Sequence, residues 1–334
     1  MTRSRDVADT QDNLGGAVAP FVAGKNKIIN GAFDIWQRGT SGTIAAGSYV
    51  AADRWYTYRN TTGSTFSRQS ASLTGFQYSG RIARDSGNTA TANISLGQSI
   101  ESINSIPFAG QTVVLSFWAK AGANFSATSS ILRARLLSST TTDQNIVLNG
   151  GTTVIDQNVT LTTSWQRFSY TAAVGSTALT LGNIFSYDPT GTAGAADNFE
   201  VTGVQLELGS VATPFTTASG SIGGELALCQ RYYWRRPSSG DDFIAAGFQL
   251  STTSSVFQLA YPTTMRVAPT SFDTSSLKTS DSSSYTTAAT FSSADYKSTN
   301  GLRFIVSHSG VGAQFRPANL LIETSGHLGA SAEL

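Results

Sequence analysis

Apolar and polar residues alternate with a period of two along most of this chain, which is the pattern of β-strands that bury one face. The clearest run is WQRFSYTAAV at 165–174, whose buried face would carry Phe168, Tyr170, Ala172 and Val174. The period recurs in YSGRIARD at 78–85 and ANISLGQSI at 92–100, whereas TVVLSFWAKAG at 112–122 is more continuously apolar. Turn clusters such as LNGGTT separate the runs. This spacing predicts a two-sheet β-sandwich over residues 26–217.

One run changes its register at a glycine. In FEVTGVQLEL, Phe199 and Val201 share one parity, whereas Val204 and Leu206 share the other. All four residues can face the core only if the strand carries one extra residue between them. Gly203 occupies that point and tolerates the left-handed backbone that a bulge needs, so we predict a β-bulge there.

The pattern changes after the sandwich, where good helix formers replace alternating residues. ELALCQRYYWRR is free of proline until Pro237, which predicts a short helical linker over 218–237. Its apolar stripe is thin, with Leu226, Cys229 and Tyr233 at i, i+3 and i+7. Such a stripe fits a seam between identical copies around a symmetry axis, or a connector packed against the sandwich. Cys229 is predicted to be a small buried hydrophobe rather than a reactive thiol.

Residues 238–334 return to β patterning and predict a second, smaller C-terminal β-domain. Ser- and Thr-rich loops are expected between its strands, notably at 274–300, and such loops are typical of recognition surfaces as well as of ordinary solvated loops. Tyr285 and Tyr296 lie in this polar stretch and are the candidate residues for stacking on a sugar ring. The domain has few large apolar side chains, so burial of strands between copies in a trimeric tip would stabilise it.

Residues 1–25 are first polar and then small, without periodicity. The segment has too few apolar residues to fold alone. A disordered tail and an extended arm that docks the protein onto a larger assembly both fit this composition.

Composition excludes several classes of partner. Charged residues make up only 13% of the chain and the net charge is +1, so no strong field would steer it onto nucleic acid. The longest apolar runs are shorter than a membrane helix requires, and the N-terminus lacks the apolar core of a secretory signal. We therefore expect neither nucleic-acid binding nor membrane insertion. Low charge and abundant hydroxyl groups favour a neutral, hydrogen-bonding partner.

The sequence predicts a protein that is not an enzyme and uses no cofactor. It contains only two histidines, His308 and His327, and no GxSxG, HExxH, CxxC, P-loop or GxGxxG motif. Glycoside hydrolysis would need two carboxylates at a defined separation. Pairs such as Glu200 and Glu207 arise by chance among 21 acidic residues, so no catalytic residue is assigned.

Two sequence blocks carry a family resemblance. The first, NKIINGAFDIWQRGTSGTIAAGSYVAADRW at 26–55, would pack apolar residues around a bend beside an exposed Asp53–Arg54 pair that forms a structural corner. The second runs from VQLELGSVATPF to GELALCQRYYWRR at 204–236. In this order the blocks resemble bacteriophage fibre and adhesin proteins that carry a carbohydrate-binding-module-like jelly roll. Such modules often hold a structural calcium, but Asp34 and Asp197 are equally explained as loop and turn residues, and no metal site is predicted.

The resemblance implies an all-β virion protein: a jelly-roll β-sandwich, a short helical linker and a smaller C-terminal β tip, assembled as a homotrimer. We expect a tail fibre of a tailed phage, held on tail or capsid proteins through residues 1–25 and attached to a host cell-surface glycan. A head fibre or capsid-decoration protein would have the same sequence character. A glycan depolymerase is the second alternative, and a secreted lectin would need an export signal.

Overall fold

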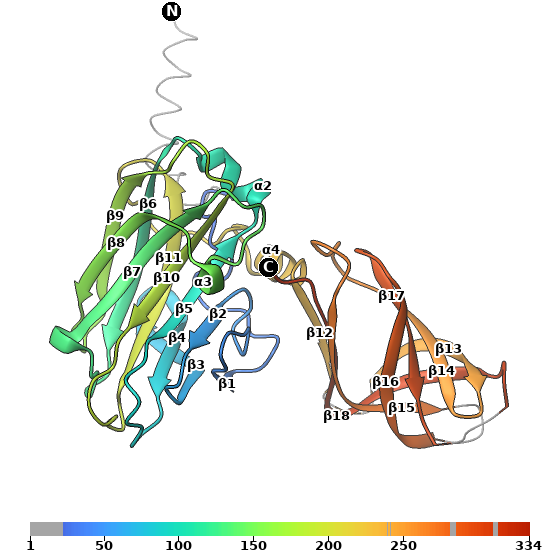
Figure 1. Ribbon diagram of the computed structural model, residues 1–334. Helices are drawn as coiled ribbons and strands as arrows, with labels where there is room; N and C mark the ends of the chain where they lie inside the picture. Colours follow the sequence, from blue (N-terminus) through green and yellow to red (C-terminus); the bar gives the residue numbers. More distant parts are fainter. Residues whose placement is uncertain (1–22, 239, 241, 281–284, 310–312) are drawn as a thin grey trace, which may run out of the picture. The chain divides into compact units, whose positions relative to one another are not determined.

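The computed structural model describes residues 23–238, 240, 242–280, 285–309 and 313–334. They form two compact units, one extending to Leu226 and including Leu334, the other from Ala227 to Glu333 (Figure 1). Most of the arm expected over 1–25 lies outside the described residues. Among the helices that the structure describes, none is long and apolar enough to cross a membrane.

The first unit is a jelly-roll β-sandwich of two antiparallel sheets (Figure 1). The six-stranded sheet has the order β1-β3-β4-β11-β6-β9 and the five-stranded sheet the order β2-β5-β10-β7-β8. The six-stranded sheet consists of β1 (Ser41–Thr43), β3 (Ser64–Leu73), β4 (Phe76–Arg84), β6 (Thr112–Ala121), β9 (Gln166–Ala173) and β11 (Asn198–Leu208). The five-stranded sheet consists of β2 (Tyr56–Arg59), β5 (Ile94–Ile100), β7 (Ile131–Ser139), β8 (Thr152–Thr160) and β10 (Thr180–Tyr187). Short helical turns lie in the connections: α2 (Ser102–Ser105), η2 (Ile106–Phe108), η3 (Thr128–Ser130) and α3 (Ile146–Asn149). The sandwich predicted from the alternating pattern is confirmed.

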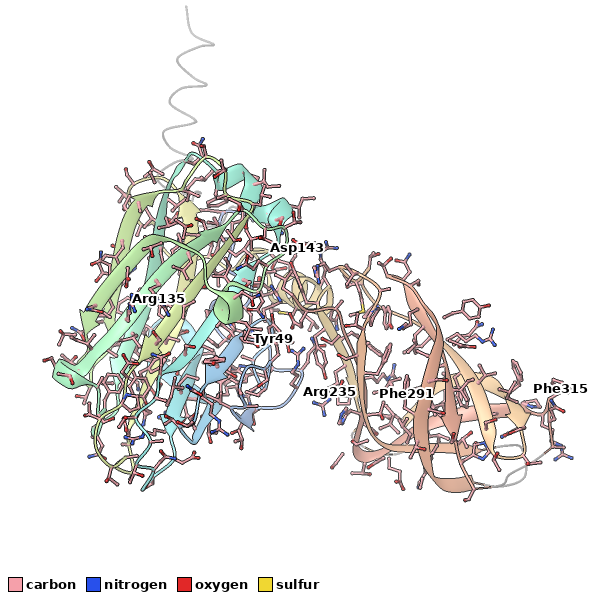
Figure 2. The ribbon with its side chains drawn as sticks, in the orientation of Figure 1. Tyr49, Arg135, Asp143, Arg235, Phe291 and Phe315 are labelled. Atoms are coloured by element: carbon pink, nitrogen blue, oxygen red, sulfur yellow. The ribbon has the colours of Figure 1, made fainter. Side chains whose placement is uncertain are left out.

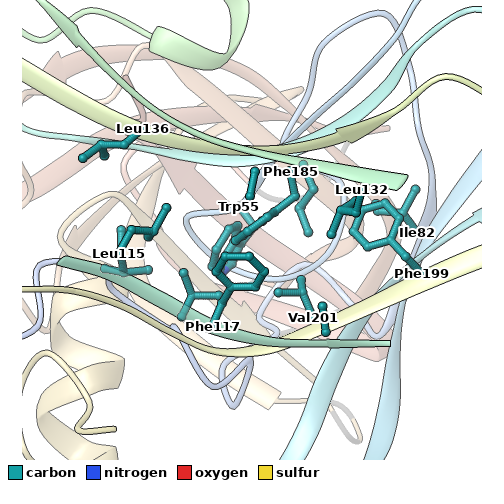
Figure 3. Packing of buried hydrophobic residues seen from close by; sticks show 14 of the residues in the cluster. Trp55, Ile82, Leu115, Phe117, Leu132, Leu136, Phe185, Phe199 and Val201 are labelled. Carbon is teal, nitrogen blue, oxygen red and sulfur yellow. The ribbon is translucent and has the colours of Figure 1, made fainter. Parts of the chain in front are cut away.

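Large apolar side chains fill the space between the two sheets (Figure 3). Phe117 of β6 meets Phe185 of β10 with ring centroids 4.7 Å apart, so the two sheets are in direct aromatic contact. Trp55 is fully buried and stacks on Phe33 at 4.6 Å, while its indole N–H donates to the carbonyl of Asn30 at 2.9 Å. Burial of each such side chain stabilises the fold by about 1.5–3 kcal/mol.

The β-bulge predicted at Gly203 is confirmed. The pairing of β11 with β6 shifts between Thr202 and Gln205, and Gly203 has a φ of 60°. Val201 and Val204, on either side of the shift, are both fully buried. A Cβ at Gly203 would lie 2.6 Å from the ring of Phe76, so backbone conformation and packing both require glycine here.

The two sequence blocks that carry the family resemblance meet through buried hydrogen bonds. The Asn26 amide donates to the carbonyl of Val204 at 3.1 Å, and the backbone N–H of Asn30 donates to the carboxylate of Glu225. All four residues belong to the sandwich unit. Burial of these polar groups is tolerated because each finds a partner in the other block. The blocks therefore close the sandwich and contribute to its stability.

The Asp53–Arg54 pair is buried, which corrects the expectation that it would be exposed. The two residues are 0% and 1% exposed. Gln37 donates to the Asp53 carboxylate at 2.7 Å, and the Arg54 guanidinium donates to the carbonyl of Ser99 at 2.8 Å. Both charges can be buried because neighbouring loops and strands supply hydrogen-bond partners. The pair is a structural corner, as predicted.

The segment predicted as a helical linker contains one helix, α4 (Ile222–Gln230). The expected stripe from Leu226 to Tyr233 is wrong, because Tyr233 begins strand β12 (Tyr233–Pro237). Consecutive aromatic residues favour a strand, and the carbonyl of Tyr232 accepts a hydrogen bond from the N–H of Ala332 at 2.7 Å. A seam between copies therefore cannot use that stripe.

The second unit is a small antiparallel barrel, which confirms the predicted smaller β-domain. Its strands have the order β12-β18-β13-β14-β17-β16-β15, and a further pairing of β18 with β15 closes the ring. The remaining strands are β13 (Asp242–Ser251), β14 (Ser254–Ala260), β15 (Ser271–Ser280), β16 (Tyr285–Lys297), β17 (Gly301–Ser307) and β18 (Pro317–Ser331). Closure gives the barrel strands partners on both sides, which an open sheet of this size would lack at its edges.

The Ser- and Thr-rich stretch at 274–300, expected to be a loop, instead lies mainly in strands β15 and β16. Leu277 of β15 pairs with Ala289 of β16, and both are buried in the barrel core. Threonine favours strands because its branched side chain fits a pleated surface, and an apolar residue every few positions is enough to fill so small a barrel. β15 also pairs with β18, so contacts distant in sequence determine this hairpin.

Candidate functional site

Strand β7 carries two arginines on one face. Arg133 and Arg135 alternate with three fully buried core residues, Leu132, Ala134 and Leu136. Because successive side chains of a strand point to opposite faces, the arginines lie on the outer face of the five-stranded sheet. Figure 2 labels Arg135 on this side of the sandwich.

Strand pairing aligns polar residues across the outer face. Arg133 lies opposite Ser186 of β10 on one side and Asn158 of β8 on the other. Ser186 in turn lies opposite Ser95 of β5. Neighbouring strands are about 4.8 Å apart, so this row of four side chains extends over roughly 14 Å. A second row places Arg135 opposite Asp156.

An apolar cluster covers the neighbouring part of the same face. Its buried members are Tyr56, Leu137, Ile146, Val147 and Ile184, and Tyr49 and Tyr58 pack against them. Helix α3 reaches the sheet at two glycines, since a Cβ at Gly182 would lie 2.7 Å from Ile146 and one at Gly97 would lie 2.8 Å from Val147. The cluster limits the open part of the face to the polar rows.

The open part is a groove with a volume of about 860 Å³. Its lining is mostly polar: Asn93, Ala127, Thr128, Ile131, Arg133, Arg135, Asp156, Asn158, Ser186, Tyr187 and Asp188. A concave site of this size, with hydrogen-bonding groups held on strands, can orient a small ligand precisely enough for specific recognition. We call it the arginine groove.

Arg133 is fixed in the arginine groove by Asp156. The guanidinium donates to both carboxylate oxygens, through Nε to Oδ1 at 2.7 Å and through Nη2 to Oδ2. The hydrogen bond lowers the pKa of Asp156 and raises that of Arg133. The Arg133 side chain is 49% exposed and that of Asp156 is 31% exposed. Water therefore screens the pair, which contributes at most about 1 kcal/mol to stability. Its main effect is to hold the guanidinium in one orientation.

Arg135 has a different environment. Its Nε is buried and has no hydrogen-bond partner among the described residues. Burial lowers the pKa of its guanidinium, and the neighbouring positive charge of Arg133 lowers it further. Arginine stays charged at neutral pH even so, and therefore the groove contains a cation whose Nε has no hydrogen-bond partner among the described residues.

Acceptors lie at another edge of the groove. The Asn93 amide donates to the carboxylate of Asp188 at 2.8 Å and to the carbonyl of Tyr187 at 3.2 Å. Asp188 is exposed and keeps capacity for further hydrogen bonds. The groove thus offers both donors and acceptors, which suits a ligand that carries many hydroxyl groups.

The two tyrosines predicted as glycan-stacking residues are not brought together. Tyr285 and Tyr296 lie near opposite ends of strand β16, and the side chain of Tyr285 is outside the described residues. Tyr296 is 66% exposed and lines a hollow of about 510 Å³ on the barrel. The guanidinium of Arg303 lies over its ring, 5.1 Å from the centroid. Tyr296 therefore stays a candidate for a separate contact, in a strand and not in the loop we expected.

The barrel also contains a serine, a histidine and an aspartate in contact. Ser275 Oγ lies 2.9 Å from His327 Nδ1, and His327 Nε2 lies 3.2 Å from Asp273 Oδ2. The Asp273 carboxylate also accepts from the Tyr233 hydroxyl at 2.8 Å and fills the space beside Gly329, where a Cβ would be 2.0 Å away. A nucleophilic serine usually sits at a sharp turn beside oxyanion donors, whereas Ser275 lies within strand β15. The contacts join the neighbouring strands β12, β15 and β18.

Two carboxylates that the sequence offered as catalytic or calcium-binding candidates, Glu200 and Asp197, have charged partners in the sandwich. Glu200 lies 2.6 Å from Arg81 and 3.5 Å from Lys120. Asp197 forms a fully buried ion pair with Arg84 through Oδ2 at 3.2 Å, and its Oδ1 accepts from the backbone N–H of Ser126 at 2.9 Å. Within the described ranges, no cluster of three or more His, Cys, Asp or Glu side chains could hold a metal ion. Cys229 is fully buried, as predicted.

Sequence reasoning missed the arginine groove. The signal was present in ILRARLL, where arginines at i and i+2 alternate with apolar residues that must face the core. Two arginines on the solvent side of a central strand indicate a charged patch. Asp156, Asp188 and Asn93 come from other strands and loops, and only the pairing shown by the structure brings them to the same face.

The sequence matches no family profile and no curated protein. Among solved structures, the chain is similar to one described as "CBM4 structure and function", with 19% identity over 54% of this chain and 98% of that chain, at a TM-score of 0.32. A Family 16 carbohydrate-binding module is 14% identical over 42% of this chain and 84% of its own, at a TM-score of 0.29. The enzymatically active domain of bacteriophage CBA120 tailspike protein 4 is 16% identical over 55% of this chain and 21% of its own, at 0.31. We draw no functional conclusion from similarities this low.

Proposed function

We propose that this protein binds glycans through the arginine groove and serves as a virion structural protein, a tail fibre that attaches a tailed phage to its host. The observation that supports glycan binding is the groove itself, where strands hold donors and acceptors side by side. A sugar hydroxyl both donates and accepts hydrogen bonds, so such a surface can pair with several hydroxyls at once. The open sheet face provides length for an oligosaccharide.

The proposed assembly is a homotrimer held on tail or capsid proteins through residues 1–25. The paired sequence blocks at 26–55 and 204–236 support this part of the proposal through their resemblance to phage fibres. Single glycan contacts are weak, and several identical copies on one particle would convert weak contacts into firm attachment. A head fibre or capsid-decoration protein would use the same groove and differ in where the arm docks.

We propose that the protein acts by binding and not by catalysis. The depolymerase alternative predicts release of reducing ends from a polysaccharide that the protein binds. Incubation of the purified protein with each bound polysaccharide, followed by a reducing-end assay, distinguishes the two functions. Turnover that is lost on substitution of one carboxylate would establish the enzyme.

Blocking the groove tests glycan binding directly. Asn158 is exposed in the polar row, and Asn158→Trp would fill the groove without disturbing the core. We expect binding on an array of bacterial surface polysaccharides to be lost in this variant. Asn60→Trp, which places the same bulk at an exposed position outside the groove lining, is the matched control. Equal binding by wild type and Asn158→Trp would exclude the groove, and failure of the wild type to bind any polysaccharide would contradict the proposed function.

A further inference from the structure

Arg135 is the residue of the arginine groove whose hydrogen-bonding capacity the fold leaves unused. Arg133, two residues earlier, is held by both oxygens of Asp156. Arg135 lies directly opposite Asp156 in the strand pairing, yet its buried Nε finds no partner in the described part of the chain. A buried donor without a partner costs about 1–3 kcal/mol, and more when it is charged. Arg135 also lines the groove, so a ligand there can approach its guanidinium.

Among the described residues, no carboxylate lies within hydrogen-bond distance of the Arg135 guanidinium. Asp156 is engaged by Arg133, and Asp188 accepts from Asn93. The outer-face neighbour of Arg135 on β10 is the apolar Ile184. A ligand group beside Arg135 would therefore contact one guanidinium that is partly shielded from water. This guanidinium lies between the apolar Ile184 and the Arg133–Asp156 ion pair.

We infer that the arginine groove binds an acidic saccharide and that Arg135 pairs with a carboxylate of the ligand, as in a uronic acid residue. This inference rests on the proposed glycan-binding function. The planar guanidinium fork matches a carboxylate in two parallel hydrogen bonds, which a neutral hydroxyl cannot do. The net charge of +1 and the low charge content favoured a neutral partner, but they describe the whole chain and not this local site.

The electrostatics of the groove agree with an anionic ligand. Burial and the positive charge of Arg133 both act against the charged form of Arg135. A ligand carboxylate would add to the partial compensation that the nearby charges of Asp156 and Asp188 supply. The Ser186 hydroxyl and the Asn158 amide, aligned in the neighbouring row and part of the groove lining, would then contact the sugar hydroxyls.

The experiment compares acidic polysaccharides with their own carboxyl-reduced forms. The full chain is titrated with polyuronate oligomers and with the same oligomers after reduction of each carboxylate to an alcohol. An array of neutral polysaccharides is included. Wild type is compared with Arg135→Gln, which removes the charge, and with Arg135→Lys, which keeps the charge but not the fork. Arg236→Gln is the control, because Arg236 is an exposed arginine of β12 outside the groove.

We expect wild type to bind the acidic oligomer roughly 10- to 100-fold more tightly than its reduced form, the range of a charge-assisted pair. Arg135→Gln should lose this preference, Arg135→Lys should keep only part of it, and Arg236→Gln should keep all of it. Equal affinity for acidic and reduced oligomers, or a preference that survives in Arg135→Gln, would overturn the inference while leaving glycan binding intact. Binding restricted to neutral polysaccharides would also overturn the inference and leave glycan binding intact. Absence of binding to every polysaccharide would contradict the proposed function as well.

Discussion

The sandwich and the barrel bury different kinds of polar group. The sandwich buries carboxylates and guanidinium groups: Asp53, Arg54, Arg84, Glu101, Asp197, Glu200, Glu207 and Glu225. In the described part of the barrel no Asp, Glu, Lys or Arg is buried, and the buried polar residues are Ser238, Gln249, Ser255, Thr279, Ser280 and His308. Both units are β-folds of similar strand pattern. The two units therefore differ in the charge of the polar groups that they bury.

Buried charges in the sandwich connect segments that are far apart in sequence. Arg84 at the end of β4 donates to the Asp197 carboxylate and to the carbonyl of Gly191 at 2.6 Å, and Asp197 accepts from Ser126 at 2.7 Å. A buried charge requires partners in defined positions, so it fixes the geometry of long loops. In the barrel, neutral groups connect distant segments instead: Ser238 Oγ donates to the carbonyl of Ile322 at 3.0 Å, and Ser255 Oγ lies 2.9 Å from His308 Nε2.

The largest effect is expected from breaking the Arg84–Asp197 pair. Both side chains are 0% exposed, so Arg84→Met would leave the Asp197 carboxylate buried without its cation. Removal of one partner of a buried ion pair costs about 3–5 kcal/mol. We expect the Tm of the sandwich to fall by roughly 6–20 °C in a calorimetric scan.

The double variant Arg84→Met with Asp197→Leu is the control for this prediction. Apolar residues in place of both charges remove the desolvation penalty, so the double variant should regain a large part of the lost stability. A matched charge removal at an exposed pair, Arg133→Gln, should cost at most about 1 kcal/mol. A small effect of Arg84→Met alone would show that the buried charges do not fix the loops of the sandwich.

How far the sequence predicts this molecule follows from the range of the interactions involved. Alternation and the glycine at 203 predicted the sandwich and its bulge, because strand parity is a local property. The hairpin of β15 and β16 escaped prediction, since pairing with the distant β18 outweighs the loop-like composition of 274–300. The arginine groove escaped for the same reason. Arg133 and Arg135 are visible in one strand, but Asp156 and Asp188 join them only through sheet pairing.

A smaller effect is expected from pH in the barrel, which contains both histidines of the chain. Burial lowers the pKa of His308, and it lowers that of His327 together with the nearby charge of Arg235. The unfolded chain, with a histidine pKa near 6.5, then binds more protons than the folded chain in mildly acidic solution. The barrel should therefore keep its full stability above pH 6.5 and lose stability as pH falls from 6.5 towards 5.

Urea unfolding at pH 7.5 and pH 5.0 measures this difference between the units. The midpoint of the barrel transition should fall at the lower pH. In the sandwich, burial raises the pKa of Asp34 and Glu225, so these two carboxyl groups favour the opposite trend as pH falls. The double variant His308→Gln with His327→Gln should reduce the pH dependence of the barrel. A barrel transition with the same midpoint at both values of pH would contradict the lowered pKa of the two histidines.

The smallest effect on stability is expected from substitution of Tyr296. The same substitution compares the glycan-binding contributions of the barrel surface and of the arginine groove on the sandwich. Because the residue is 66% exposed and its ring contacts Arg303, Tyr296→Ala should cost no more than about 1 kcal/mol. If the barrel contributes a stacking contact to the glycan, binding should fall several-fold in this variant while the preference for acidic oligomers, which we assign to Arg135, stays unchanged. Phe315→Ala removes another exposed aromatic of the barrel and is the matched control. Unchanged binding by Tyr296→Ala would leave the arginine groove of the sandwich as the recognition surface.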